Sequence, residues 1–344
     1  MTAAVFLRSV AAIAMGVILA FTAIVPADAA TIRHDRKDRK HIKFADRRPV
    51  APVGRVVSGG ALGSGTLINR EWILTAAHVV DRSGSASFTI DGVSFGSSEI
   101  IIHNKWTGSV NRSAGYDIAL VRLTSNVTAA TGIKPAKLSK DKKPLGELAI
   151  AAGYGLGGNG RRGTKPGTSD KRSGYNTVDR LIDNGRILLT DFDDPSGRSP
   201  NALGKDKAVR FESIVAPGDS GGGLFVKKGK KWRLAGVHSF ASASDGSIDS
   251  DYGDIAGHVN VARHFRWIQR QIRNATTLKA DDLTLAATAT ADPTPRFDGD
   301  TPLALSGIVP LTLPAFTAAI PEPAAPALAL VGLGLIAARR RRAA

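Results

Sequence analysis

Short apolar runs, separated by Gly, Asn, Asp and Ser, follow one another along the chain from about residue 50 to residue 248. Each run has about the length of one β-strand, and many short strands with frequent turns are typical of an all-β sandwich or barrel. We therefore expect an all-β domain. The clearest runs are residues 65–68, 72–75, 99–102, 118–121, 148–151, 186–189 and 224–226.

One stretch, residues 261–272, has convincing helical periodicity. Val261, Phe265, Ile268 and Ile272 fall on a single face of it. The pattern predicts one helix that closes the β domain at its C-terminal side.

Residues 155–174 are rich in Gly, Lys and Arg and show no apolar period. We expect a mobile loop near a cleft, because loops of this kind carry function on a rigid scaffold. The glycines do not open a helix, which argues against a phosphate-binding loop.

The composition narrows the class of protein. The chain has 344 residues, 43% of them hydrophobic, and 0 cysteines, so disulfides and thiolate metal sites are excluded. A net charge of +16 would suit nucleic acid, but much of it lies in a basic run at 33–48 and in four arginines at 339–342. We predict that residues 30–49 form a flexible basic arm or pro-segment and that nucleic acid is not a partner. Exopolysaccharide or a membrane surface is the alternative contact for this arm.

The N-terminus has the features of a secretory signal peptide. Arg8 precedes an apolar run at 10–25, and Ala27-Asp28-Ala29 fits the small-residue cleavage pattern. We expect residues 1–29 to be removed on export; an uncleaved N-terminal membrane anchor is the alternative.

The C-terminal part changes composition twice. Residues 275–320 are rich in Ala, Thr, Pro and Asp, which predicts an extended linker. Pro321-Glu322-Pro323, an apolar run at 324–338 and the terminal arginines then follow. Residues 321–344 thus resemble a PEP-CTERM sorting signal. The resemblance implies processing by an exosortase-type enzyme and delivery to the cell surface or matrix of a Gram-negative bacterium. The apolar run, as a transmembrane helix, would anchor the protein in the membrane only transiently. A plain C-terminal membrane anchor is the alternative.

Three distant segments supply the parts of a nucleophilic site. His78 follows a strand and a small-residue turn, and Asp117 stands at the start of a buried strand. Ser220 lies in the glycine-rich stretch 218–223, where backbone N–H groups can converge on one point. A buried carboxylate needs a fixed partner, and a histidine N–H is a natural one. The three residues would be nucleophile, base and orienting acid.

These segments resemble the trypsin/chymotrypsin-like serine peptidases, which carry Thr-Ala-Ala-His, Asp-Ile-Ala-Leu and Gly-Asp-Ser-Gly-Gly motifs in this order. The resemblance covers about residues 53–274, and we place the peptidase domain at 50–274. It implies two six-stranded antiparallel β-barrels with the active site between them, and no cofactor.

Carried over by motif, the resemblance implies a role for each residue. Ser220 would be the nucleophile, His78 the general base and then acid, and Asp117 the group that orients His78. The N–H groups of Gly218 and Ser220 would form the oxyanion hole. Ser239 would support the aspartate, and 239–241 would pair with substrate backbone. We assign no role to the other histidines, His34, His41, His103, His238, His258 and His264.

One departure concerns activation. Family members activated by cleavage insert a new N-terminus beside the aspartate that precedes the serine, here Asp219. Val56 follows a sequence resembling the cleavage site, but it lies only 22 positions before His78, too close to leave the first strands of the barrel. We therefore predict that residues 53–57 form a strand. Asp219 then needs another cation, which the basic arm could supply, and the existence of a zymogen stays open.

Substrate preference follows from the walls of the pocket. An ungapped carry-over puts Ile214 at its base, Ala241 and Ala256 on its sides, and Phe240 beside the substrate backbone. This predicts small or medium apolar side chains rather than Lys or Arg. The nearby acidic loop does not match an EF-hand, so we expect a solvated loop and no metal site; its carboxylates are Asp245, Asp249, Asp251 and Asp254.

The favoured function is an exported serine endopeptidase that cleaves peptide bonds of protein or peptide substrates. The alternative is a non-catalytic surface or matrix protein on a peptidase fold. An α/β-hydrolase is disfavoured, although Gly218-Asp219-Ser220-Gly221-Gly222 satisfies its Gly-x-Ser-x-Gly motif. That fold requires a helix after the serine, with the acid and the histidine later in the chain.

Overall fold

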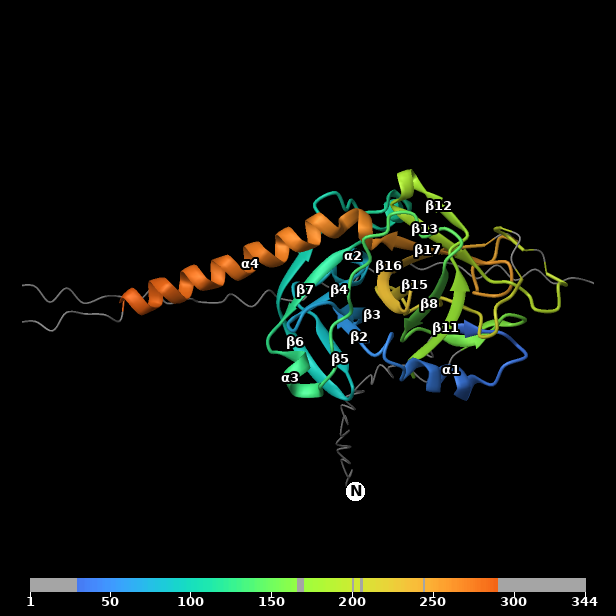
Figure 1. The fold of residues 1–344 in the computed structure, drawn as a ribbon, viewed down its shortest axis with the longest axis horizontal. Coiled ribbons are helices and arrows are strands. Elements are labelled where there is room, and N and C mark those ends of the chain that lie inside the picture. The colour runs from blue at the N-terminus through green and yellow to red at the C-terminus, as the bar shows by residue number, and fades with distance from the viewer. Residues whose placement is uncertain (1–29, 166–169, 200, 205–206, 244, 290–344) are drawn as a thin grey trace, which may run out of the picture. The chain divides into compact units, whose positions relative to one another are not determined.

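The computed structural model describes residues 30–165, 170–199, 201–204, 207–243 and 245–289, with side chains as far as residue 277 (Figure 1). The predicted signal peptide, the linker beyond residue 289 and the C-terminal sorting segment lie outside the described residues.

The first half of the domain is a closed six-stranded antiparallel barrel. Its strands follow the order β2-β3-β4-β7-β6-β5 around the barrel. Residues 53–57 are part of β2, as expected, and Val53 and Val56 face the core with no exposed surface. Val56 is therefore a barrel residue. The strands are β2 (Val53–Ser58), β3 (Ala61–Leu67), β4 (Trp72–Thr75), β5 (Ser87–Ile90), β6 (Val93–Ile102) and β7 (Ala119–Leu123).

Short helices join these strands. The helix that follows β4 is a single turn, and it carries His78 to the end of the barrel. The others lie in the connections before and after β7. They are α2 (Ala77–Val80), the 3₁₀ helix η1 (Ser109–Ala114) and α3 (Val127–Thr131).

The second half is built on a seven-stranded antiparallel sheet in the order β11-β8-β15-β16-β17-β13-β12. The long hairpin β15–β16 lies at its centre, and β15 follows the Ser220 segment directly. The strands are β8 (Leu148–Gly153), β11 (Arg172–Thr177), β12 (Arg180–Ile182), β13 (Ile187–Asp191), β15 (Gly223–Lys228), β16 (Lys231–Ser242) and β17 (Ile255–Asn260), with the 3₁₀ helix η2 (Asp183–Gly185) between β12 and β13.

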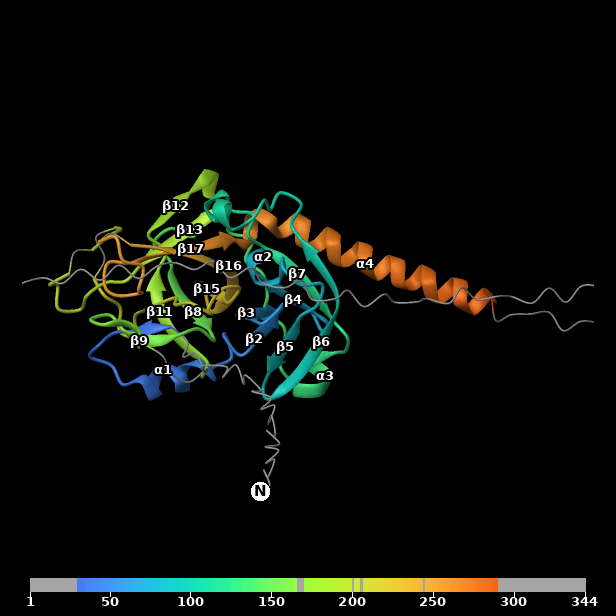
Figure 2. The same cartoon turned by 180° about the vertical axis from the view of Figure 1, so that it is seen from behind.

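The predicted C-terminal helix is confirmed, and it is longer than expected. Helix α4 (Val261–Ala289) begins directly after β17 and runs beside the first barrel (Figures 1 and 2). The Asn260 side chain accepts a hydrogen bond from the Ala262 N–H at 3.1 Å, which caps the first turn. Trp267 and Ile268 are buried in the main core. In the described part of the chain, no helix combines the length and apolar character needed to cross a membrane.

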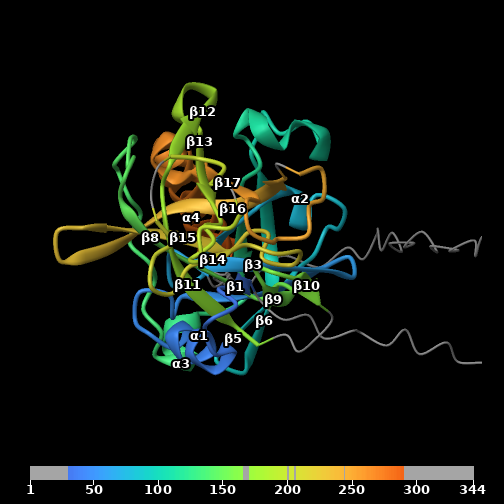
Figure 3. The ribbon, with the colours of Figure 1, turned by 90° about the vertical axis from the view of Figure 1, so that its right-hand side faces the viewer.

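Residues 30–45 differ from the flexible arm expected from their charge. Strand β1 (Thr31–Ile32) pairs with β14 (Ser213–Ile214) and with β9 (Gly157–Asn159), and β10 (Gly163–Lys165) completes a four-stranded sheet (Figure 3). Much of the stretch 155–174 is therefore strand rather than mobile loop. Strand β1 forms its hydrogen bonds with strands that are far away in sequence, and the local composition could not predict these pairings.

Helix α1 (Asp38–Ala45) follows β1 and packs on β11. Phe44 is 5% exposed, and its ring lies 4.8 Å from the Tyr175 ring and 6.1 Å from the Phe211 ring, measured between centroids. The Asp38 carboxylate accepts two hydrogen bonds of 2.6 Å from the Arg172 guanidinium. Helix α1 therefore packs on the second half of the domain through Phe44, although the segment around it is rich in charged residues.

The predicted fold class is confirmed: a mostly β protein with a closed six-stranded barrel, a second sheet and a C-terminal helix. The second half is a seven-stranded sheet with an added four-stranded sheet, where the resemblance implied a second six-stranded barrel.

The docking of α1 predicts the effect of truncating its buried ring. Phe44→Ala should lower the free energy of unfolding by about 3–5 kcal/mol, the usual cost of removing a buried phenylalanine ring. Urea denaturation measures this. Leu145→Ala is the control, since Leu145 is 59% exposed and its truncation should cost about 0.5 kcal/mol or less. Equal stability of the two variants would mean that α1 does not contribute to the folded domain.

Candidate active site

His78 and Asp117 are joined by two hydrogen bonds. The His78 ring Nδ1 lies 2.7 Å from Asp117 Oδ2, and the His78 backbone N–H donates to Oδ1 at 2.9 Å. Asp117 has no exposed surface, whereas the His78 side chain is 10% exposed. A buried carboxylate with two bonds to one histidine fixes the orientation of that ring and leaves Nε2 free to face the cavity.

Ser239 supplies the third hydrogen bond to the buried Asp117 carboxylate. Its hydroxyl donates to Asp117 Oδ2 at 2.6 Å, and Ser239 itself is 2% exposed. The sequence prediction that Ser239 supports the aspartate agrees with this contact. Asp117 therefore accepts three hydrogen bonds, supplied by α2 and β16, which belong to different halves of the domain.

Ser220 lies in a tight turn built on two glycines with positive φ. Gly218 has φ +95° and Gly221 has φ +83°, a region that other residues rarely adopt. A Cβ at Gly221 would lie 2.1 Å from Thr75 Oγ1 and 2.2 Å from the Ser64 carbonyl oxygen. The turn can therefore approach the first barrel this closely only with glycine at that position.

Ser64 of β3 ties the first barrel to this turn. Its N–H donates to the Ser220 carbonyl at 2.7 Å, and its hydroxyl donates to the Gly218 carbonyl at 3.1 Å. The Tyr154 N–H in turn donates to the Ser64 hydroxyl at 2.9 Å. Ser64 was not singled out from the sequence as a site residue, although it belongs to the stretch 63–68 that carries the family resemblance.

The N–H groups of Gly218 and Ser220 have no hydrogen-bond acceptor among the described residues, whereas the Asp219 N–H donates to the Ala216 carbonyl at 2.9 Å. Unused backbone donors are a precondition of the predicted oxyanion hole, which stays a prediction.

A cavity of about 360 Å³ contains the candidate nucleophile and base. His78 and Ser220 both line it, but among the described residues no hydrogen bond joins them. Such contacts are often loose in the absence of substrate. The other lining residues are Arg112, Val215, Ala216, Pro217, Gly218, His238, Ser239, Phe240, Ala241, Ile248 and Ser250.

The predicted specificity residues divide into two groups. Ser239, Phe240 and Ala241 line the cavity. Ile214 and Ala256 do not; both are buried in an apolar cluster with Phe192, Val215 and Tyr252. Val215, which lines the cavity, is the next residue after Ile214. Ile214 does not line the cavity, because it belongs to β14 and pairs with Thr31 of β1. The ungapped transfer of family positions to this sequence took no account of that strand pairing.

Five of the remaining histidines are buried, and one of them, His238, also lines the cavity. His238 and His258 are in contact through their Nδ1 atoms at 2.8 Å. Burial lowers the pKa of His238 to about 3 and holds that of His258 well below its usual value. Burial likewise lowers the pKa of His41, His103 and His264 to about 4. All five rings are thus neutral at neutral pH.

Three carboxylates of the predicted acidic loop gather at one point. Oxygen atoms of Asp249, Asp251 and Asp254 all lie within 4.8 Å of one another. Partial burial, followed by repulsion from the other two carboxylates, raises the pKa of Asp251 to about 6. The proximity of the three groups was not foreseen. The expected solvated loop is wrong for Asp254, which is only 1% exposed.

A buried acid–histidine pair that shares one cavity with a serine is the side-chain set of a Ser-His-Asp triad. The trypsin family model matches residues 49–268, more than half of the chain, and the chain belongs to this family. The model of the PEP-CTERM protein-sorting motif matches residues 319–342. Both resemblances seen in the sequence are therefore confirmed.

Curated relatives agree with this family. A chymotrypsin-like elastase family member 1 of Canis lupus familiaris is 42% identical over 104 residues, covering 27% of this chain and 40% of that protein. The brachyurin of Leptuca pugilator is 26% identical over 221 residues, covering 60% and 86%. An alpha- and beta-fibrinogenase of Ophiophagus hannah is 32% identical over 105 residues, covering 29% and 40%. The matches to the elastase and the fibrinogenase thus span less than half of those proteins.

The Ser239 contact predicts a stability change. Ser239→Ala removes one of three donors to a fully buried carboxylate, and hydrogen bonds to charged groups are worth about 1.5–3 kcal/mol. The free energy of unfolding should fall by about that amount in urea denaturation. Ser242→Ala, at an exposed serine of the same strand, should change it by less than about 0.5 kcal/mol. If both variants match the wild type, Ser239 does not support Asp117.

Proposed function

We propose that this protein is an exported serine endopeptidase that hydrolyses peptide bonds through His78, Asp117 and Ser220. The observation that carries the proposal is the fully buried Asp117 carboxylate, bonded to His78 at 2.7 Å, with His78 and Ser220 on the wall of one cavity. Membership of the trypsin family supports it.

The proposed reaction begins at Ser220. Its Oγ attacks the carbonyl carbon of the scissile bond while His78 Nε2 takes the hydroxyl proton. Asp117 stabilises the protonated imidazole through Nδ1. The carbonyl oxygen becomes negative and is bound by the N–H groups of Gly218 and Ser220, where each donor contributes roughly 3–4 kcal/mol.

The tetrahedral intermediate then collapses and the C–N bond breaks. His78 gives its proton to the leaving amine, and an acyl-enzyme ester remains on Ser220. Water attacks this ester with His78 again as base, and the second collapse returns the proton to Ser220 Oγ and releases the carboxylic acid. No cofactor is required by these steps.

Substrate preference is proposed from the cavity walls. Val215, Ala216, Phe240 and Ala241 are apolar, and no carboxylate is among the described residues that line the cavity. A Lys or Arg side chain would therefore enter without a counter-charge, whereas a small or medium apolar side chain would bury its surface. Arg112, which also lines the cavity, adds a cation that further disfavours basic side chains.

Export and delivery follow from the two ends of the chain. The predicted signal peptide (1–29) would direct export, and the sorting motif at 319–342 supports delivery to the surface or matrix of a Gram-negative bacterium after processing by an exosortase-type enzyme. Association with exopolysaccharide or with membrane through the tail belongs to the same proposal. A non-catalytic surface protein is the competing function, and chemical labelling separates the two.

Labelling with a serine-directed fluorophosphonate is the first test. The wild type and Ser242→Ala should be labelled, whereas Ser220→Ala and His78→Ala should not be, because the first lacks the nucleophile and the second the base. In-gel fluorescence measures this. Labelling of all four proteins to the same extent would refute the assignment, and absence of labelling in every one would favour the non-catalytic function.

Cleavage of a peptide library tests the specificity. We expect cuts after small or medium apolar residues, with values of kcat/KM at least tenfold above those for Lys or Arg, since burying an unpaired ammonium group costs more than about 1.4 kcal/mol. Mass spectrometry of the products measures this. A strong preference for Lys or Arg would show that a carboxylate reaches the pocket in the complex with substrate.

A further inference from the structure

The side chain of Arg112 lines the active-site cavity and has no acceptor. It shares this cavity with His78 and Ser220. Its Nε is buried, and no hydrogen bond or ion pair joins its guanidinium group to another of the described residues. In the described part of the chain, Arg112 is the only arginine with a buried side-chain nitrogen that lacks a hydrogen-bond partner. A buried donor without an acceptor costs free energy, so an acceptor is expected to reach this group in the working protein.

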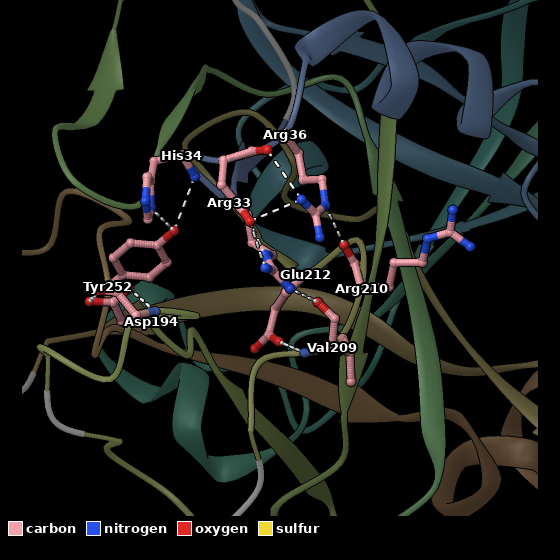
Figure 4. Close-up of polar contacts among 10 residues, drawn as sticks. Arg33, His34, Arg36, Asp194, Val209, Arg210, Glu212 and Tyr252 are labelled. Carbon is pink, nitrogen blue, oxygen red and sulfur yellow. Dashed lines mark hydrogen bonds and ion pairs between the residues drawn. The ribbon is translucent and has the colours of Figure 1, made fainter.

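The cations of the basic N-terminal segment are engaged elsewhere. Arg33 donates to the Val209 carbonyl at 2.7 Å, and Arg36 donates to the carbonyl of the next residue at 3.0 Å (Figure 4). The sequence suggested that this segment could supply a cation to Asp219. The Asp219 carboxylate instead accepts the backbone N–H of Ala30 at 3.0 Å, so the segment contributes an N–H group rather than the expected cation.

The acidic residues on either side of His78 in the fold do not neutralise Arg112. Asp117 accepts its three hydrogen bonds from other groups. Asp81, which follows helix α2, accepts a hydrogen bond from Trp106 Nε1 at 3.0 Å and forms no ion pair with Arg112. No carboxylate is among the described residues that line the cavity. The acceptor for the guanidinium group would therefore come from a molecule that enters the cavity.

The local backbone fixes the position of Arg112. This residue belongs to the 3₁₀ helix η1, which contacts strand β16. The helix ends at Gly115, whose N–H donates to the Arg112 carbonyl at 3.3 Å and whose φ is +77°. A Cβ at Gly115 would lie 2.5 Å from the Arg186 Cβ, so this turn requires glycine. Phe240 and Ala241 of β16 line the same cavity as Arg112.

The geometry of an extended substrate indicates which of its side chains meets Arg112. Residues 239–241 are predicted to pair with the substrate backbone, and successive side chains of an extended chain point to opposite sides. The residue before the scissile bond would direct its side chain toward the apolar wall formed by Val215 and Ala216 of the second half. The preceding substrate residue would then point toward the first barrel, whose connections carry His78 and Arg112.

We propose that Arg112 binds the carboxylate of an Asp or Glu at the second substrate residue on the N-terminal side of the scissile bond. The inference rests on the proposed peptidase function and names its substrate class: peptides with an acidic residue followed by a small or medium apolar one. A guanidinium group donates two parallel hydrogen bonds to a carboxylate, and such charge-assisted bonds are about twice as strong as neutral ones. An acidic side chain at this position would thus supply the acceptor that Arg112 lacks.

The test compares two peptides that have the same apolar residue before the scissile bond and either Glu or Gln before that residue. For the wild type, kcat/KM should be about tenfold or more higher for the Glu peptide, because only Glu carries the charge. For Arg112→Gln the two values should agree within about twofold, since the cation is gone. Arg266→Gln, at an exposed arginine of α4, is the matched control and should keep the wild-type ratio.

Two further measurements separate an ion pair from a merely structural effect. The ratio of kcat/KM between the Glu and Gln peptides should fall as the salt concentration rises, because salt screens the attraction. Arg112→Lys keeps the charge but loses the planar fork, so it should retain part of the ratio. If Arg112 had only a structural role, Arg112→Gln would lower kcat/KM for both peptides and leave their ratio unchanged, which would overturn the inference.

The remaining outcomes are distinct. Equal cleavage of the Glu and Gln peptides by the wild type overturns this inference and leaves the peptidase function intact. An acidic preference that the wild type shows only at another substrate position overturns it as well. If the wild type neither cleaves these peptides nor reacts with the fluorophosphonate, the peptidase function fails and the inference fails with it.

Discussion

The architecture of the site depends on one buried carboxylate. Asp117 has no exposed surface, and it is stable there because three donors converge on it: the ring and the backbone N–H of His78, and the hydroxyl of Ser239. His78 is carried by the first barrel and Ser239 by the central hairpin of the second sheet. A single polar contact network thus fixes how the two halves meet and holds the imidazole toward the cavity.

The second constraint is the turn that carries Ser220. Glycines at positions 218 and 221 allow its conformation, and Ser64 binds it to the first barrel. The same turn contains Asp219, whose carboxylate reaches inward to Ala30. One side of the turn therefore carries Ser220, the proposed nucleophile, while Asp219 ties the other side to the start of the described chain. The N-terminal segment thus contacts the residue next to Ser220.

Much of this could be predicted from the sequence, because the information is local. Short apolar runs predicted the strands. A small-residue turn singled out His78, the start of a buried strand Asp117, and a glycine-rich stretch Ser220. The prediction of a flexible N-terminal arm was wrong. It rested on the many charged residues of the segment, whereas Phe44 of the same segment packs on Tyr175 and Phe211, which are far away in sequence. The placement of Ile214 failed for a related reason: a strand pairing between residues far apart in sequence decides which side chain faces the pocket.

The central claim is that Ser220 hydrolyses peptide bonds with His78 as its general base and Asp117 as the group that orients His78. The most direct measurement is kcat for Asp117→Asn on a peptide that the wild type cleaves, in a protein shown by circular dichroism to be folded. The account predicts a fall of roughly 10⁴-fold, because the amide would hold the imidazole in the wrong tautomer. A kcat within tenfold of the wild type would contradict it.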